Sequence, residues 1–332
     1  MKQHFDLRTW ILLGMGAATL AVFAMLGQAS FTSFDNIQSM LLQASVIGIL
    51  SLAVSISLLS GGIDLSVNST ANLTAICASI VMAAAEPELG AALAIPLGVA
   101  AGLVASLACG ALNGVLIARL QCPPILATLG TMMVIMGLGT VITQGETLFG
   151  LDGWAGIARF TFLGFPVAAV VMLCLAASLS LIMVYTLLGR RIGLIGANVK
   201  AARFSGIPIA NVLIRTYLIS GGLSGIAGLL SLSISNSVNV DFGSSYLLLA
   251  VLIAVLGGID PAGGKGKIFG VVAAVGLLQL LSTGLNMLYQ SSSSNFLKEF
   301  AWGLALLAVL ALGRAKWIGD VKQLLKSERK AQ

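Results

Sequence analysis

Long stretches without a charged residue separate the charges of this chain, and they constrain its fold more than any other feature. A charge at the centre of a bilayer costs roughly 2.5 to 3.5 kcal/mol even on the most lenient scale, so spanning segments exclude charges. A helix needs about 20 apolar residues to cross about 30 Å of hydrocarbon. The chain has 332 residues, of which 58% are hydrophobic and only 9% are charged, whereas soluble domains are about 25% charged. We therefore expect an all-α polytopic membrane protein.

Ten uncharged stretches predict ten transmembrane helices in a single transmembrane domain, residues 1–332. The last stretch is short, so its helix is expected to begin near Asn295, with Lys298 and Glu299 at the interface. The ten stretches run from Arg8 to Asp35, Asp35 to Asp64, Asp64 to Glu86, Glu88 to Arg119, Arg119 to Glu146, Arg159 to Arg190, Arg215 to Asp241, Asp241 to Asp260, Lys267 to Lys298, and Glu299 to Arg314.

The basic residues predict the orientation, because cytoplasmic loops of membrane proteins carry an excess of Lys and Arg. With ten helices and a cytoplasmic N-terminus, only Arg159 and Lys298 of the 18 Lys and Arg residues fall outside. Both termini are then cytoplasmic. The longest basic segments inside are a loop at about 189–215 and a tail at about 314–332.

Several classes of protein function require residues that this chain lacks. The only histidine is His4, and the four cysteines have no C-x-x-C spacing, so neither a metal site nor a catalytic constellation is expected. The Gly257–Gly266 segment fails as a phosphate-binding loop because Ile259 and Gly266 replace required residues, and it is interpreted as a flexible turn. The charges flank apolar spans and form no basic stripe, so nucleic-acid binding is not expected. We expect no bound cofactor and no ATPase site in this chain.

The segment that joins the second and third spans, Leu59 to Ser69, has an unusual composition. Gly61 and Gly62 permit a sharp reversal, Asp64 places an acid in the turn, and Ser66 is suited to cap the next helix. A simple turn with a helix cap is the alternative interpretation of the same residues.

The loop from Gly189 to Pro208 contains a second unusual segment. Its residues Asn198 to Phe204 predict a short amphipathic helix with Asn198 as its cap, bounded by Gly196 and Gly206. Its basic residues also satisfy the positive-inside rule without any further role.

Three runs of residues, in this order, make the chain resemble a known family. Gly61–Ser69 is similar to the hallmark G-G-I-D-L-S-V-G-S of the permease subunits of bacterial ABC importers for ribose, arabinose, xylose and related carbohydrates. Asn113–Ala118 with Pro123–Met132 resembles the family's N-G-x-L-I-A and P-P-x-x-A-T-L-G-T-M, and Gly189–Ile207 resembles its G-R-x-x-x-A-I-G-G-N-x-x-A-A-R-x-S-G-I. The resemblance covers nearly the whole chain.

The resemblance implies a function and a set of partners. The chain would be a permease subunit in a bacterial inner membrane, working with ABC ATPase subunits, a second permease in a homodimer or heterodimer, and a periplasmic or extracellular substrate-binding protein. Two departures bear on the substrate. Asn68 replaces a Gly, and Leu247–Leu249 replace an acidic E-L-D run. These departures favour either a pseudo-symmetric heterodimer with a second permease or a less polar ligand such as a deoxy sugar or a signalling furanose, with a pentose as the alternative.

Three sets of residues are expected to carry transport. The helix in the basic loop would contact the ATPase, and the turn after the second span would rearrange during gating. Uncharged polar residues in the spans would replace the water that a sugar loses, although Asn and Thr also bond across helices in simple packing. The coupling residues are Asn198, Lys200, Ala201, Ala202, Arg203 and Phe204; the gating turn is Gly61, Gly62, Asp64 and Ser66; and the path set is Asn72, Asn113, Thr128, Thr131, Asn236 and Asn286.

Two other classes compete with this interpretation. An ATP-independent channel or facilitator for small polar solutes is the main alternative, but it has no need of a basic loop with an embedded capped helix. A membrane-embedded enzyme would need a nucleophile, base or metal group within the bilayer, and the spans contain none.

Overall fold

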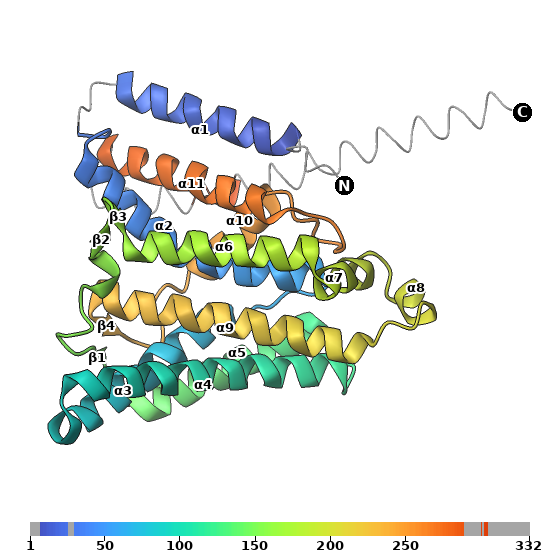
Figure 1. Cartoon of the computed structure of the whole chain (residues 1–332), viewed down its shortest axis with the longest axis horizontal. Coiled ribbons are helices and arrows are strands. Elements are labelled where there is room, and N and C mark those ends of the chain that lie inside the picture. The colour runs from blue at the N-terminus through green and yellow to red at the C-terminus, as the bar shows by residue number, and fades with distance from the viewer. Residues whose placement is uncertain (1–6, 26–29, 289–299, 301, 305–332) are drawn as a thin grey trace, which may run out of the picture. The chain divides into compact units, whose positions relative to one another are not determined.

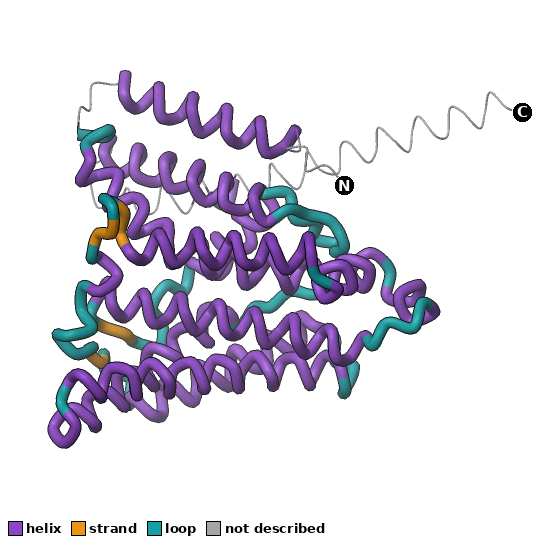
Figure 2. Tube along the Cα trace, viewed as in Figure 1, coloured by secondary structure: helices purple, strands orange, loops and turns teal. Residues whose placement is uncertain are grey.

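The computed structural model describes residues 7–25, 30–288, 300 and 302–304. The chain divides into two units, residues 1–284 and 285–332, and the following description concerns the first. Its described residues are mainly helical, with four two-residue strands in the loops (Figures 1 and 2).

Nine of the ten predicted stretches contain a helix of their own. Seven of these helices are long and apolar enough to cross a membrane: α2 (Phe34–Leu59), α3 (Val67–Leu89), α4 (Ala91–Ala118), α5 (Pro124–Thr143), α6 (Val167–Tyr185), α9 (Ile209–Ser235) and α11 (Ile268–Leu288). The first stretch forms α1 (Leu7–Met25) and the eighth forms α10 (Tyr246–Leu256). The predicted tenth helix lies almost entirely outside the described residues.

Helix α10 is shorter than the sequence predicts. Its 11 residues extend only about 16 Å at 1.5 Å per residue, about half of the hydrocarbon thickness. The residues before it form a loop instead, in which β4 (Ser237–Val238) pairs antiparallel with β1 (Leu148–Phe149). The uncharged stretch between Asp241 and Asp260 therefore contains residues that lie outside α10.

The connections between helices gather in two groups, one at each end of the bundle. At the first, the "turn end", the N–H of Gly264 donates to the carbonyl of Leu59 at 3.0 Å, and a side chain on Gly196 would collide with that carbonyl. At the second, the "strand end", β1 pairs with β4, Ser79 donates to the carbonyl of Phe149, and β2 (Thr161–Phe162) pairs with β3 (Phe165–Pro166). The turn end holds the connections 60–66, 119–123, 186–208 and 257–267.

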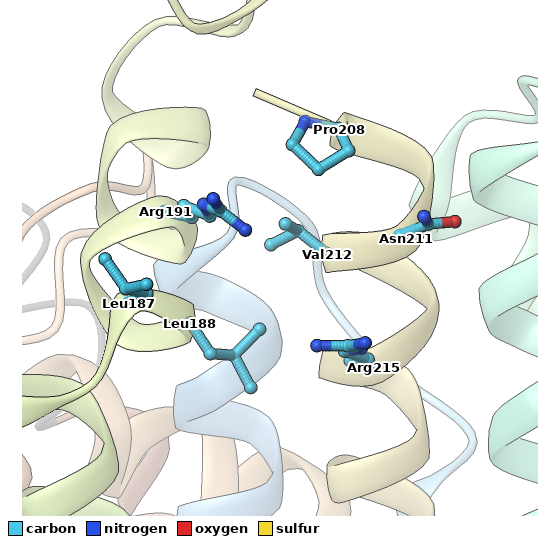
Figure 3. Close-up of a pocket in the computed structure, with 7 residues that line it drawn as sticks. All are labelled: Leu187, Leu188, Arg191, Pro208, Asn211, Val212 and Arg215. Atoms are coloured by element: carbon cyan, nitrogen blue, oxygen red, sulfur yellow. The ribbon is translucent and has the colours of Figure 1, made fainter. Parts of the chain in front are cut away.

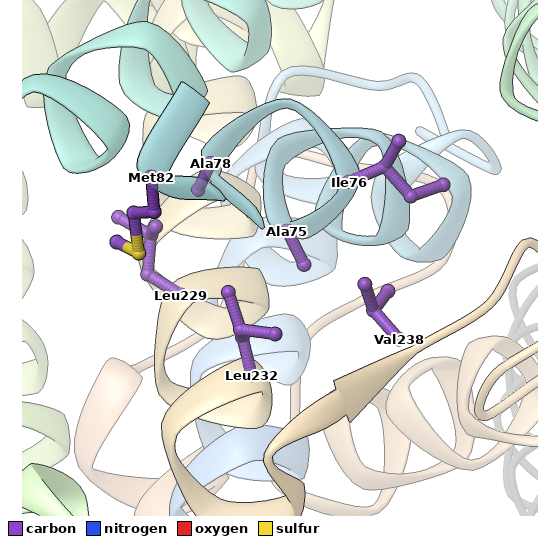
Figure 4. Packing of buried hydrophobic residues seen from close by; sticks show 7 residues of the cluster. All are labelled: Ala75, Ile76, Ala78, Met82, Leu229, Leu232 and Val238. Carbon is purple, nitrogen blue, oxygen red and sulfur yellow. The ribbon is translucent and has the colours of Figure 1, made fainter. Parts of the chain in front are cut away.

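Helices α3, α4 and α9 pack closely through glycine. A Cβ on Gly221 of α9 would lie 2.6 Å from the carbonyl oxygen of Ser106 in α4, and one on Gly228 would collide with the carbonyl of Ala71 in α3. Small residues let helix backbones approach in this way. Beside this contact, buried side chains of α3, α9 and β4 form an apolar cluster (Figure 4): Ala75, Ile76, Ala78, Met82, Leu229, Leu232 and Val238.

Candidate functional site

The turn that follows α2 requires glycine at two positions. Gly61 has a φ of +86°, in the left-handed region that glycine adopts without strain. A Cβ on Gly62 would lie 2.6 Å from the hydroxyl oxygen of Tyr217 and 2.9 Å from Cβ of Pro124. The reversal predicted from the glycine pair is present, and it is packed between α5 and α9.

Asp64 is buried inside this turn, with only 1% of its surface exposed. Its Oδ1 accepts from the backbone N–H of Ser66 at 3.0 Å and from the Ser66 hydroxyl at 2.7 Å, and its Oδ2 accepts from the Ser220 hydroxyl at 2.7 Å. No basic side chain of the described residues is paired with it. Burial raises the pKa of this carboxyl above its usual range, against the lowering effect of the bonds from Ser66 and Ser220.

The surroundings of Asp64 differ from the sequence interpretation in two ways. Ser66 stands at the N-cap position of α3, but its side chain does not cap that helix, because its hydroxyl bonds Asp64 instead. The turn also folds inward until Asp64 contacts Ser220, the twelfth residue of α9, a contact that the sequence did not indicate. The acid is tolerated there because three donors surround it.

A chain of hydrogen bonds joins this turn to three residues of the predicted path set. The Asn113 side chain of α4 donates to the Ser66 hydroxyl at 2.8 Å, and the Thr131 hydroxyl of α5 donates to Oδ1 of Asn113 at 2.6 Å. The Thr128 hydroxyl donates to the carbonyl of Ile63 at 3.0 Å. The structure therefore places the turn residues and half of the path set in one polar network, which we call the Asp64 network: Asp64, Ser66, Asn113, Thr128, Thr131 and Ser220.

Sequence reasoning missed Ser220 and also Tyr217. Ser220 supplies the bond from α9 to Asp64, and the buried Tyr217 hydroxyl beside Gly62 has no hydrogen-bond partner among the described residues. Both stand in an apolar helix where serine and tyrosine are unremarkable. Only the fold brings them to a turn more than 150 positions earlier, so no local pattern marks them.

The other path residues lie elsewhere. Asn72 of α3 donates to the carbonyls of Val240 and Phe242 at 2.8 and 2.9 Å, which fastens the loop before α10. Asn236 ends α9 in the left-handed conformation, with its side-chain oxygen buried and unpartnered. Asn286 lies in α11, within the second unit.

The basic loop contains the capped helix that the sequence predicts. After α7 (Leu187–Ala197), the Asn198 side chain accepts from the N–H of Ala201 at 3.0 Å and caps α8 (Val199–Phe204). Ala202 is 3% exposed and packs inward, whereas Phe204 is 94% exposed. Lys200, Ala201 and Arg203 are also exposed. Helix α8 thus presents an uncovered aromatic ring together with two exposed cations, Lys200 and Arg203.

Among the described residues, no three His, Cys, Asp or Glu side chains come together as a metal group.

Seven helices of spanning length, a buried network around one acid and an exposed basic helix define a polytopic α-helical membrane protein.

Comparison with known proteins identifies the family. The model described as "Branched-chain amino acid transport system / permease component" matches residues 36–312. The ribose import permease protein RbsC of Bacillus subtilis (strain 168) is 35% identical over 306 residues, which are 91% of this chain and 92% of that protein. The autoinducer 2 import system permease protein LsrD of Yersinia enterocolitica is 34% identical over 276 residues, 81% of this chain and 80% of that protein. The chain belongs to this family of permease components, which confirms the resemblance carried by its motifs.

Proposed function

We propose that this chain is the membrane permease of an ATP-driven importer and moves a small carbohydrate or sugar-like ligand into the cell. One observation carries the proposal: a nearly full-length match to import permeases that are named for ribose and autoinducer 2. The Asp64 network supports it, because amide and hydroxyl groups can replace the hydrogen bonds that a sugar loses when it leaves water.

The orientation belongs to the same proposal. We assign ten helices in the bacterial inner membrane, with both termini and the loops of the turn end in the cytoplasm. The distribution of Lys and Arg supports this side, since Arg119, Arg190, Arg191, Lys200, Arg203, Lys265 and Lys267 all belong to connections of the turn end.

ATP would act through partner subunits that contact α8. Phe204 would enter a groove of an ABC ATPase, with Lys200, Ala201 and Arg203 around it, while Asn198 fixes the start of the helix and Ala202 seats it on the permease. A second permease, identical or related, and an external substrate-binding protein would complete the importer.

The contacts of the turn end suggest how motion at α8 reaches the network. Gly196 is the second-last residue of α7 and lies two residues before Asn198, the cap of α8. Its Cα lies 3.4 Å from the position that a Cβ on Gly61 would occupy. Gly61 begins the turn that holds Asp64, and Asp64 is joined through Ser66 to Asn113 and Thr131. Gly61, Gly62, Asp64 and Ser66 would therefore rearrange when the ATPases close. Shifting a two-state equilibrium from 1:99 to 99:1 takes about 5.5 kcal/mol, which must come from nucleotide binding.

Reconstitution tests this function. Proteoliposomes that contain the permease, its partner permease, the ATPase and the binding protein should accumulate ligand inward only with ATP, and collapse of a proton gradient should not change the rate at constant ATP. Uptake in the absence of ATP and ATPase would establish the alternative, a channel or facilitator. Accumulation driven by a proton gradient alone would also contradict the proposal.

A further inference from the structure

A cavity lies between α7 and the first turns of α9, apart from the Asp64 network. Its volume is about 350 Å³, and seven residues line it: Leu187, Leu188, Arg191, Pro208, Asn211, Val212 and Arg215. Two of the seven are arginines from different helices. Figure 3 shows both guanidinium groups directed into the space between α7 and α9.

The two arginines carry charges that no described residue neutralises. Among the described residues, no acid forms an ion pair with Arg191 or Arg215, and the cavity lining contains no carboxylate. Two cations that share a cavity repel each other. An anion between them would offset this repulsion and would also attract both guanidinium groups. Arginine is suited to this role because its planar fork binds two oxygens of a phosphate group at once.

The rest of the lining is suited to a ligand with an apolar part. Leu187 and Leu188 lie about one helical turn from Arg191 on α7, and Val212 lies about one turn from Arg215 on α9, so apolar side chains adjoin both guanidinium groups. A free inorganic anion has no use for the leucines. A phospholipid uses both kinds of side chain, with its phosphate on the guanidinium groups and its glycerol and upper acyl chain on the neighbouring leucines and valine.

Helix α9 is long enough to carry this cavity at the level of lipid headgroups. Helix α9 has 27 residues, about 40 Å at 1.5 Å per residue, so it exceeds the hydrocarbon core by about 10 Å. Arg215 is its seventh residue, about 9 Å from the start of the helix. Helix α6 ends at Tyr185, just before the leucines of the cavity.

We propose that Arg191 and Arg215 bind the phosphate of an anionic phospholipid, which is held between α7 and α9. Basic pockets between helices at the edge of the bilayer have the chemistry for this ligand. The bound lipid would join α7, which precedes the exposed helix α8, to α9, which carries Ser220 of the Asp64 network. The proposal does not depend on which solute the permease moves.

Titration of the purified permease in uncharged detergent tests the site. Short-chain phosphatidylglycerol, short-chain phosphatidylcholine and inorganic phosphate are compared by the shift that each causes in the melting temperature. Phosphatidylglycerol should raise the melting temperature saturably, and the other two should not at equal concentration. Saturable binding of inorganic phosphate without any preference for phosphatidylglycerol would overturn the lipid assignment in favour of a soluble anion.

Matched variants separate the cavity from general attraction to basic loops. Arg191→Gln with Arg215→Gln should weaken phosphatidylglycerol binding about 30-fold, if each arginine contributes about 1 kcal/mol. Arg119→Gln with Arg190→Gln removes the same charge from the same end but lines no part of the cavity, so it should weaken binding less than about fivefold. Equal losses in the two double variants would overturn the proposal.

A charge-conserving variant covers the case in which the glutamine pair does not fold. Arg191→Lys with Arg215→Lys keeps both cations but loses the forked geometry, so binding should weaken severalfold while the charge stays the same. Unchanged affinity in the lysine pair would contradict a phosphate held between two guanidinium groups.

Discussion

Replacement of Asp64 by Asn separates the structural role of this residue from its role in transport. Asn has the same shape, and its oxygen can keep both bonds from Ser66. Its amide can donate to the Ser220 oxygen while the Ser220 hydroxyl turns to the carbonyl of Ala53, already 3.3 Å away. Because no donor is orphaned and a desolvated charge is removed, we expect stability within about 1 kcal/mol of the wild type.

Replacement by Ala should behave differently. Without an acceptor at position 64, the backbone N–H and the hydroxyl of Ser66 lose their partner in a buried site. Each buried unsatisfied group costs about 1 to 3 kcal/mol, and the release of a buried carboxylate offsets part of that loss. We therefore expect Asp64→Ala to lose about 2 to 4 kcal/mol.

The effect of pH gives a second readout with a definite sign. Because burial raises the pKa of Asp64 in the folded protein, the stability that its protonation provides is fully present below the unfolded pKa of about 4 and is lost as pH rises through the folded pKa. Asp64→Asn has no such loss, so its melting temperature relative to wild type should increase from pH 4 upward. Asp241→Asn makes the same chemical change at an exposed position and serves as the matched control.

The assay is a melting curve at several pH values together with uptake at matched expression. If the carboxylate takes part in gating, Asp64→Asn should stay folded and lose at least tenfold in uptake. If Asp64→Asn unfolds as readily as Asp64→Ala, the hydrogen-bond reasoning is refuted. If Asp64→Asn transports normally, the acid has no place in gating.

Two further predictions address the ATPase contact and helix packing. Phe204→Ala should weaken association with the ATPase by roughly 2 kcal/mol or more, because the uncovered Phe204 ring is the largest apolar group of α8. Copurification measures the association. Phe162→Ala removes an exposed ring at the strand end and should leave copurification unchanged. Gly228→Ala should lower the free energy of unfolding by about 1 to 3 kcal/mol, because the new Cβ meets the carbonyl of Ala71. The control is Gly137→Ala, which has open space around it and should be neutral or stabilising. Melting curves of the two variants measure the difference.

The sequence predicted helix positions well because the cost of a charge in lipid acts locally. Each of the nine described stretches contains a helix, and the Asn198 cap forms as expected. The short α10 could not be predicted, because its length depends on a loop that pairs with β1 and is held by Asn72 across 168 positions.

The site was only partly predictable for the same reason. Asn72 and Asn113 are the same residue type in neighbouring spans, yet one fastens a loop and the other joins the Asp64 network. The two asparagines differ in their hydrogen-bond partners, and those partners are distant in sequence. Ser220 shows the converse, since nothing in its own segment marks it as a ligand of Asp64.

The contacts of the turn end also impose an order on biosynthesis. The carbonyl of Leu59 bonds the N–H of Gly264, and Gly61 lies against Gly263, so the turn finds these partners only after some 200 further residues have been made. Until then, the Leu59 carbonyl of a nascent chain that already contains α2, α3 and α9 lacks the N–H donor of Gly264. A chain that stops before residue 264 therefore lacks contacts that hold this turn in the folded protein.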